Sequence, residues 1–270
     1  MSIDDVRKRA KQLSESFARV AKIKGGHLKD AAQLELALEQ LPTPELYQAA
    51  RTEIAEKAKA WISEVRQSQA QVFQAYLAEF LRKARDAGDV TRETGIGWRV
   101  GALELEVQPQ SARCRALYSR EEVVDWREIR AATDFERLVK DARQKLSKAE
   151  IDSRILADVL WEAYVARRPS SGGSDWVKLV DLFEELRVVL VRRDVKGSAH
   201  RRLKFAEFPK WAALYNLDRY LAQSRGIPED RRLVPETGSQ ADVKQGLGCL
   251  LNGLDPSVQP MAYCHIRGAR

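Results

Sequence analysis

Apolar side chains recur with a helical period over residues 1–20. They are separated by 4, 3, 4 and 3 positions, and they are Val6, Ala10, Leu13, Phe17 and Val20. Two apolar positions in every heptad make a stripe that suits one partner helix but is too narrow for a fully enclosed helix. These five side chains are therefore the predicted partner-binding surface. The partner is either a larger protein or a second copy of this chain.

One long helix is predicted between Pro44 and Gly88. Thr43 supplies an N-cap, Pro44 suits the first helical turn, and no further Gly or Pro occurs before Gly88. Apolar residues repeat along this stretch with a period of about 3.6 residues. Residues 1–90 are thus expected to form a helical domain, arranged either as an antiparallel hairpin or as a coiled-coil arm that pairs with another chain.

The pattern changes to that of β-strands after Gly88. Residues 98–107 alternate apolar and polar side chains, which places Glu104 and Glu106 together on a face directed to solvent. A short polar turn follows, and residues 113–117 continue the alternation as a returning strand. We therefore expect a β-hairpin within residues 91–120.

Three capping-box patterns follow the hairpin and predict three helix starts. The last of these helices, over residues 148–168, has the apolar content of a core helix, and a shorter helix is expected at 175–186. The capping pairs are Ser119 with Glu122, Thr133 with Glu136, and Ser147 with Glu150.

A two-stranded ribbon is predicted next, from the β-branched run 187–193 and the stretch 201–208. A helix that continues through Arg193 is the competing assignment. Helices followed by such a ribbon give the order of a winged-helix domain, which we assign to residues 121–225.

The remaining residues, 226–270, are a proline-punctuated extension. A small helix starting at Ser239 and ending near Leu251, and an edge strand at 261–266, are expected within it. The predicted fold class is α+β and mostly helical, with a long helical arm, a β-hairpin and a winged-helix-like C-terminal body.

Positive charge is concentrated at the tip of the predicted ribbon. The chain has 46 Lys and Arg against 39 Asp and Glu, a net charge of +7. Only Asp194 opposes the six cations that fall within a 13-residue stretch. A cluster of this kind attracts a phosphate backbone, so the predicted nucleic-acid-binding residues are Arg192, Arg193, Lys196, Arg201, Arg202 and Lys204. Acidic residues along 175–186 make that helix a poor reader of bases, so backbone contact without sequence selection is expected.

Other functional classes find little support. No apolar leader or membrane-length apolar run is present, which indicates a cytoplasmic protein without membrane contact. The three cysteines lack metal-site spacing, the three histidines lack catalytic neighbours, and no phosphate-binding glycine motif occurs. We expect no catalytic residue, no metal and no cofactor. A metal-dependent nuclease that uses Glu104 and Glu106, with Asp89 upstream, is an alternative.

The general plan of a helical arm joined to a winged-helix-like body resembles the accessory subunits of bacterial DNA-handling machines. It implies a non-catalytic subunit that contacts nucleic acid, with DNA favoured, through its basic ribbon and a partner protein through its N-terminal helices. A protein-binding adaptor or scaffold, whose basic ribbon docks on an acidic protein surface, is the main alternative.

Overall fold

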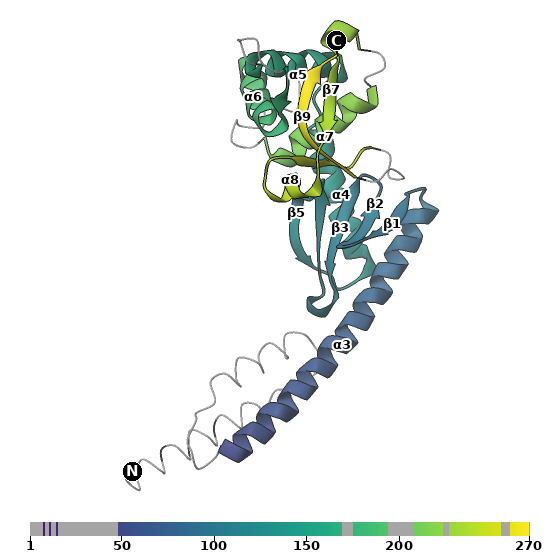
Figure 1. Cartoon of the computed structure of the whole chain (residues 1–270). Coiled ribbons are helices and arrows are strands. Elements are labelled where there is room, and N and C mark those ends of the chain that lie inside the picture. Colours follow the sequence, from purple (N-terminus) through teal and green to yellow (C-terminus); the bar gives the residue numbers. More distant parts are fainter. Residues whose placement is uncertain are drawn as a thin grey trace. The chain divides into compact units, whose positions relative to one another are not determined.

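The structure, a computed structural model, describes residues 8, 11, 15, 48–168, 175–193, 208–223, 227–254 and 260–269 (Figure 1). It is a mixed α+β protein whose strands pair in antiparallel fashion. The chain divides into two compact units. The first contains residues 1–78, 108–113 and 128–131, and the second contains the rest, including nearly all strand residues.

Helix α3 (Gln48–Asp86) has 39 residues. At 1.5 Å per residue it is about 58 Å long, and it confirms the long helix predicted from the absence of Gly and Pro. Lys83 and Arg85 occupy its last turn, where positive charge interacts favourably with the helix dipole. Neither α3 nor any other helix of the described segments has the length and apolar character needed to cross a membrane.

The predicted partner-binding stripe, from Val6 to Val20, lies outside the described residues. Within this stretch the structure describes Lys8, Lys11 and Glu15, which are helical and exposed. The stripe therefore stays a prediction.

Five strands in sequential order form the first sheet (Figure 1). The predicted hairpin is confirmed as its β3–β4 pair, but the sheet is larger than a hairpin because the run 98–107 is broken at Gly101, whose φ is 59°. Two strands result from that run instead of one. The strands are β1 (Thr91–Thr94), β2 (Gly97–Val100), β3 (Leu103–Gln108), β4 (Arg113–Tyr118) and β5 (Glu121–Glu128).

The helix predicted to start at Ser119 is wrong. Ser119 and Arg120 both have positive φ, 52° and 66°, and they join β4 to β5. Two successive residues with positive φ are typical of a type I′ hairpin turn, whose twist matches that of the flanking strands. The Ser-x-x-Glu pattern here belongs to a strand connection and not to a helix cap.

Helix α4 (Ala132–Lys148) starts just before the position predicted from the Thr133 capping box, so Thr133 lies within the helix, which packs on the first sheet. Its Phe135 ring stacks on Phe80 of α3, with 5.4 Å between ring centroids. The Nζ of Lys145 donates to the Val123 carbonyl of β5 at 2.7 Å. These contacts hold α4 against α3 and β5.

Helix α5 (Ser153–Arg167) begins later than predicted, because Ser147 lies in the last turn of α4 and caps no helix. Asp152 is the actual N-cap and accepts from the backbone N–H of Arg154 at 2.9 Å. The buried positions of α5 are those expected of a core helix, and they include Leu156, Val159, Leu160, Ala163 and Tyr164.

The first strand of the predicted ribbon is also wrong, and the competing helical assignment is correct. Helix α6 (Leu179–Arg192) includes residues 187–192, and it follows the short strand β6 (Val177–Lys178). Burial of Leu182, Leu186 and Val189 at helical spacing outweighs the β-propensity of the run. Apart from buried Phe208, the second predicted strand lies outside the described residues. Residues 187–193 therefore supply no wing strand.

A second sheet is built around β9 (Met261–Gly268), which pairs with three other strands. The predicted edge strand is thus the central one. Its neighbours are β6, β7 (Leu233–Thr237) and β8 (Cys249–Leu251). Helix α8 (Gln240–Lys244) has the predicted Ser239 capping box but ends before β8 begins. Helix α7 (Lys210–Gln223) starts directly after Pro209.

Replacing Gly97 with alanine is expected to destabilise the protein by about 1–3 kcal/mol. Gly97 has φ +154°, and a Cβ there would overlap the backbone carbonyl of Leu105 on the neighbouring strand β3. Gly95 is a matched control because a Cβ there meets nothing within 4 Å. Urea unfolding of both variants tests this, and equal midpoints for Gly97→Ala and Gly95→Ala would contradict it.

Candidate functional site

The structure places two of the six predicted nucleic-acid-binding residues, both at the C-terminal end of α6. The Arg192 side chain is 65% exposed, and its Nη1 lies 3.9 Å from Oε1 of Glu185. The Nε of Arg193 donates to Oε2 of Glu162 on α5 at 2.7 Å. A phosphate group could reach the exposed Arg192 side chain directly. At Arg193 it would have to compete with the carboxylate of Glu162. Lys196, Arg201, Arg202 and Lys204 lie outside the described residues.

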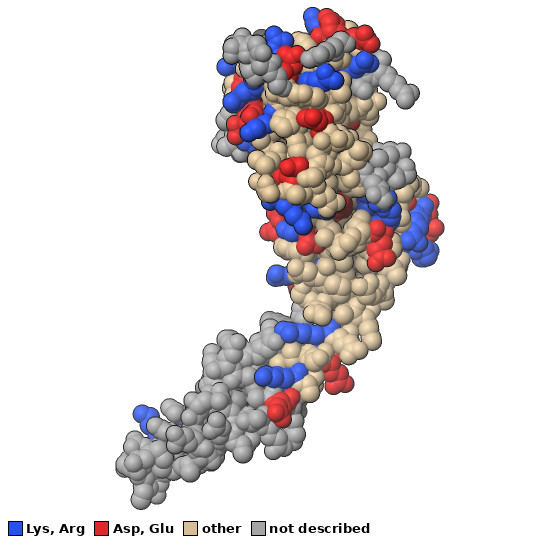
Figure 2. Space-filling model, in the orientation of Figure 1, with Lys and Arg blue, Asp and Glu red and all other residues tan. Residues whose placement is uncertain are grey.

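The described surface otherwise mixes both signs of charge. Figure 2 shows Lys and Arg interspersed with Asp and Glu over the visible face. Ion pairs account for much of this mixture: the Nε of Arg167 lies 3.0 Å from Glu185, and the Nη1 of Arg127 lies 2.7 Å from Asp141. A continuous cationic surface would need the charge of residues 194–204 in addition.

A pocket of about 500 Å³ opens beside Arg193. One face of α5 forms its wall, and two arginines flank it, Arg193 after α6 and Arg231 before β7. Each arginine is held by an α5 carboxylate: Glu162 binds Arg193, and Asp158 lies 3.3 Å from Nη1 of Arg231. The pocket is lined by Asp158, Trp161, Glu162, Val165, Ala166, Arg193 and Arg231.

The two strand glutamates considered for a nuclease do not share a solvated face. Glu104 is only 4% exposed, so its predicted exposure is wrong, and it pairs across the sheet with Arg99. Glu106 accepts from Arg115, whose Nη2 is 2.7 Å away. Each carboxylate thus has a cationic neighbour that competes with a divalent metal. Groups of three or more His, Cys, Asp or Glu able to hold a metal are not found among the described residues.

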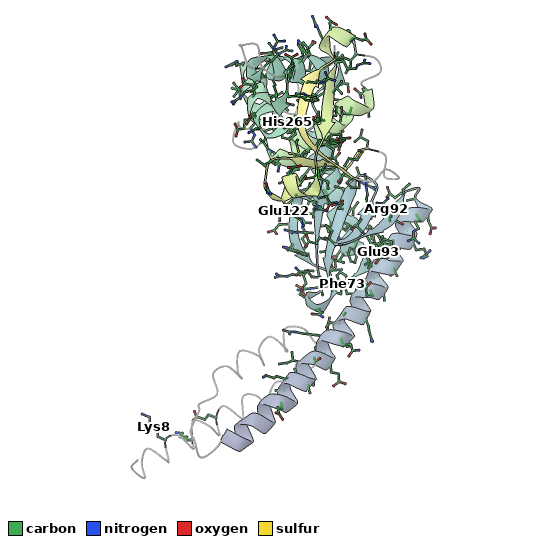
Figure 3. The ribbon with its side chains drawn as sticks, in the orientation of Figure 1. Lys8, Phe73, Arg92, Glu93, Glu122 and His265 are labelled. Atoms are coloured by element: carbon green, nitrogen blue, oxygen red, sulfur yellow. The ribbon has the colours of Figure 1, made fainter. Side chains whose placement is uncertain are left out.

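A buried polar network, unforeseen from the sequence, joins the first sheet to the chain that follows β8. Arg99 on β2 is 1% exposed, and its Nη2 donates to the carbonyls of Asn252 at 2.8 Å and Gly253 at 2.9 Å. Burial lowers the pKa of Arg99, while the charge of Glu104 partly offsets that effect. Arg92, the partner of Arg99 on β1, lies at the outer edge of the sheet (Figure 3).

Asp218 of α7 forms the second part of this network. Its Oδ2 accepts from the Tyr118 hydroxyl at 2.6 Å and from the Gly253 N–H at 3.2 Å. Burial raises the pKa of Asp218 to about 6, against the lowering effect of these hydrogen bonds and of Arg99. Burial, together with the neighbouring Asp218, also raises the pKa of Tyr118. The carboxyl group therefore titrates near neutral pH inside the protein.

Three buried atoms of the network have no hydrogen-bond partner among the described residues. They are Oε2 of Glu104 and both side-chain amide atoms of Asn252. Burial raises the pKa of Glu104, against the lowering effects of the charges of Arg120 and Arg99. The network ties the first sheet, α7 and the chain after β8 together.

Comparison with known proteins adds no constraint on function. No protein-family model, curated protein or solved structure matches this chain.

Proposed function

We propose that this chain is a non-catalytic accessory protein that contacts the phosphate backbone of DNA without sequence selection. The contact surface is the basic segment Arg192–Lys204, and a partner protein binds the N-terminal stripe Val6–Val20. The observation that carries the proposal is the run of six cations opposed only by Asp194, in a chain whose charges otherwise nearly cancel. Concentrated cations gain affinity for a polyanion by releasing its condensed counterions.

The position of Arg192 supports this proposal. It is the last residue of α6, and its side chain is exposed, so the basic segment begins at a helix end that solvent reaches. The contact with Glu185 is long, at 3.9 Å, and Glu185 has a shorter ion pair with Arg167 at 3.0 Å. A phosphate oxygen can therefore replace Glu185 with little loss of stability.

The acidic residues of α6 argue for backbone contact over base reading. Glu184 is 68% exposed and would repel the phosphates that line a DNA groove. Glu185, expected from the sequence to face outward, is instead largely buried against Arg167. The outward acidic face is smaller than predicted, but Glu184 still disfavours insertion of α6 into a groove. The contact is then limited to the end of the helix and the segment after it.

Changing Arg192, Arg201 and Arg202 together to Gln is expected to weaken binding of the full chain to duplex DNA by about tenfold or more. The dependence of affinity on salt should also become shallower, by about 0.9 in the log–log slope for each phosphate that the protein no longer neutralises. Fluorescence anisotropy with a labelled duplex at several salt concentrations measures both. Arg193 is left unchanged, because its removal would leave Glu162 without its cation.

A variant with Arg82, Arg130 and Arg154 changed to Gln is the matched control. It has the same net charge, and its arginines are 68%, 78% and 87% exposed, so it should fold normally and bind as the wild type does. Equal weakening in both variants would show that net charge, and not the basic segment, governs binding. Unchanged, salt-insensitive affinity in the first variant would overturn the proposal in favour of a protein-binding adaptor.

A further inference from the structure

We infer that the pocket beside α5 binds one nucleotide unit, with its base against Trp161 and its phosphate between Arg193 and Arg231. The inference rests on the proposed function in taking nucleic acid chemistry as the ligand. It adds a site that reads a single base and phosphate and that shares Arg193 with the duplex-binding segment. All residues of this pocket lie in the second compact unit.

Both arginines are held beside the pocket by carboxylates on one face of α5. Asp158 and Glu162 are four residues apart on α5, so their Cβ atoms lie about 5–6 Å apart on one helix face. Each carboxylate holds one arginine, through Nε of Arg193 and through Nη1 of Arg231. A guanidinium has donors on all three nitrogens, so both arginines can bind phosphate oxygens while keeping these ion pairs.

The apolar part of the wall suits a base. Trp161 is half-buried and is braced by Tyr164, whose ring centroid lies 5.3 Å away, and by Gly268, where a Cβ would come within 3.3 Å of the indole. Val165, one turn further along α5, is 46% exposed. A planar base can cover these two side chains, and aromatic stacking is tolerant of base identity. The bound base would then cover the exposed apolar surface of α5.

The carboxylates set a preference among bases. Asp158 and Glu162 can accept hydrogen bonds from an exocyclic amino group, which adenine has and uracil lacks. They also balance the two arginines, so the lining has no net charge and does not attract every anion. Adenosine monophosphate should therefore bind more tightly than uridine monophosphate, and inorganic phosphate alone should bind weakly. The pocket volume lies within the range usual for small-molecule sites.

Isothermal titration of the full chain with adenosine monophosphate tests this inference. Arg231→Gln should weaken binding by about tenfold, because a charge-assisted hydrogen bond to phosphate is removed. Arg232→Gln is the matched control: Arg232 is adjacent, is paired with Glu229 at 3.2 Å and does not line the pocket. Its affinity should stay within about twofold of the wild type. Both side chains are surface groups, so both variants should fold.

Single-stranded oligonucleotides with and without a 5′-phosphate identify the source of the nucleotide. A strand end is the ligand if Arg231→Gln weakens the phosphorylated strand selectively, and a free nucleotide is the ligand if only the monophosphate responds. Absence of saturable binding of the monophosphate, or equal affinity in the wild type and Arg231→Gln, overturns the inference. Neither result changes the duplex assay, in which Arg231 and Arg193 are kept, so failure of one proposal is distinguishable from failure of the other.

Discussion

Arg99→Met is expected to lower the free energy of unfolding by about 4 kcal/mol. The arginine is 1% exposed, and its removal leaves the Asn252 and Gly253 carbonyls without their donor. Glu104 would also lose one of the two cations, Arg120 and Arg99, that favour its charged form. Urea unfolding of the full chain, followed by far-ultraviolet circular dichroism, measures the effect.

Arg92→Met is the matched control for this prediction. Arg92 is the cross-strand partner of Arg99 on β1, but it is only partly buried, so its removal should change stability by less than about 1 kcal/mol. Adding Glu104→Gln to Arg99→Met should recover part of the stability, because the buried charge is then removed together with its partner. A double variant less stable than Arg99→Met would contradict this account of the network.

Stability is expected to fall by about 3 kcal/mol through Asp218 alone as the pH rises from about 4 to about 7. The pKa of Asp218 is about 6 in the folded protein, above the ordinary value of 3.8, so folding binds a proton between these values. The contribution is fully present below pH 3.8 and is lost as the pH rises through 6. The cause is burial, which disfavours the carboxylate more than Tyr118, Gly253 and Arg99 favour it.

Asp218→Asn isolates this contribution because the amide does not titrate. The free energy of unfolding of the variant, relative to the wild type, should rise by about 3 kcal/mol between about pH 4 and about pH 7. Tyr118→Phe, which removes one hydrogen bond to the carboxylate, should move the midpoint of the wild-type decrease to higher pH. Parallel stability curves for the wild type and Asp218→Asn would mean that the carboxyl group does not titrate in this range.

Helical periodicity predicted much of the fold because it reports on local packing. The absence of Gly and Pro predicted α3, and the apolar content of residues 148–168 predicted α5. Local patterns failed where a distant partner decides the structure. The Ser119 capping box is compatible with a helix start and with a hairpin turn, and pairing of β5 with β4 selects the turn. The β-branched run 187–192 is helical because it continues α6, whose Leu182, Leu186 and Val189 are buried at helical spacing.

The candidate sites were less accessible from the sequence than the helices. Asp218 gave a usable signal, because it lies four residues after Leu214 and three before Leu221, within the apolar stripe of α7. A charged residue in such a stripe indicates a buried partner. Arg99 gave none, since its acceptor Asn252 is 153 residues away in the chain. The pocket likewise depends on how α5, Arg193 and Arg231 come together in the fold.

The central position of β9 determines when the second sheet can form during synthesis of the chain. Strands β6, β7 and β8 each pair with β9, which follows all three in the sequence. Until Met261–Gly268 is made, these three strands expose unpaired backbone groups, which are open to association with other chains. A product of translation that halts before Met261 would therefore be prone to aggregate, even though α4, α5 and the first sheet had already been synthesised.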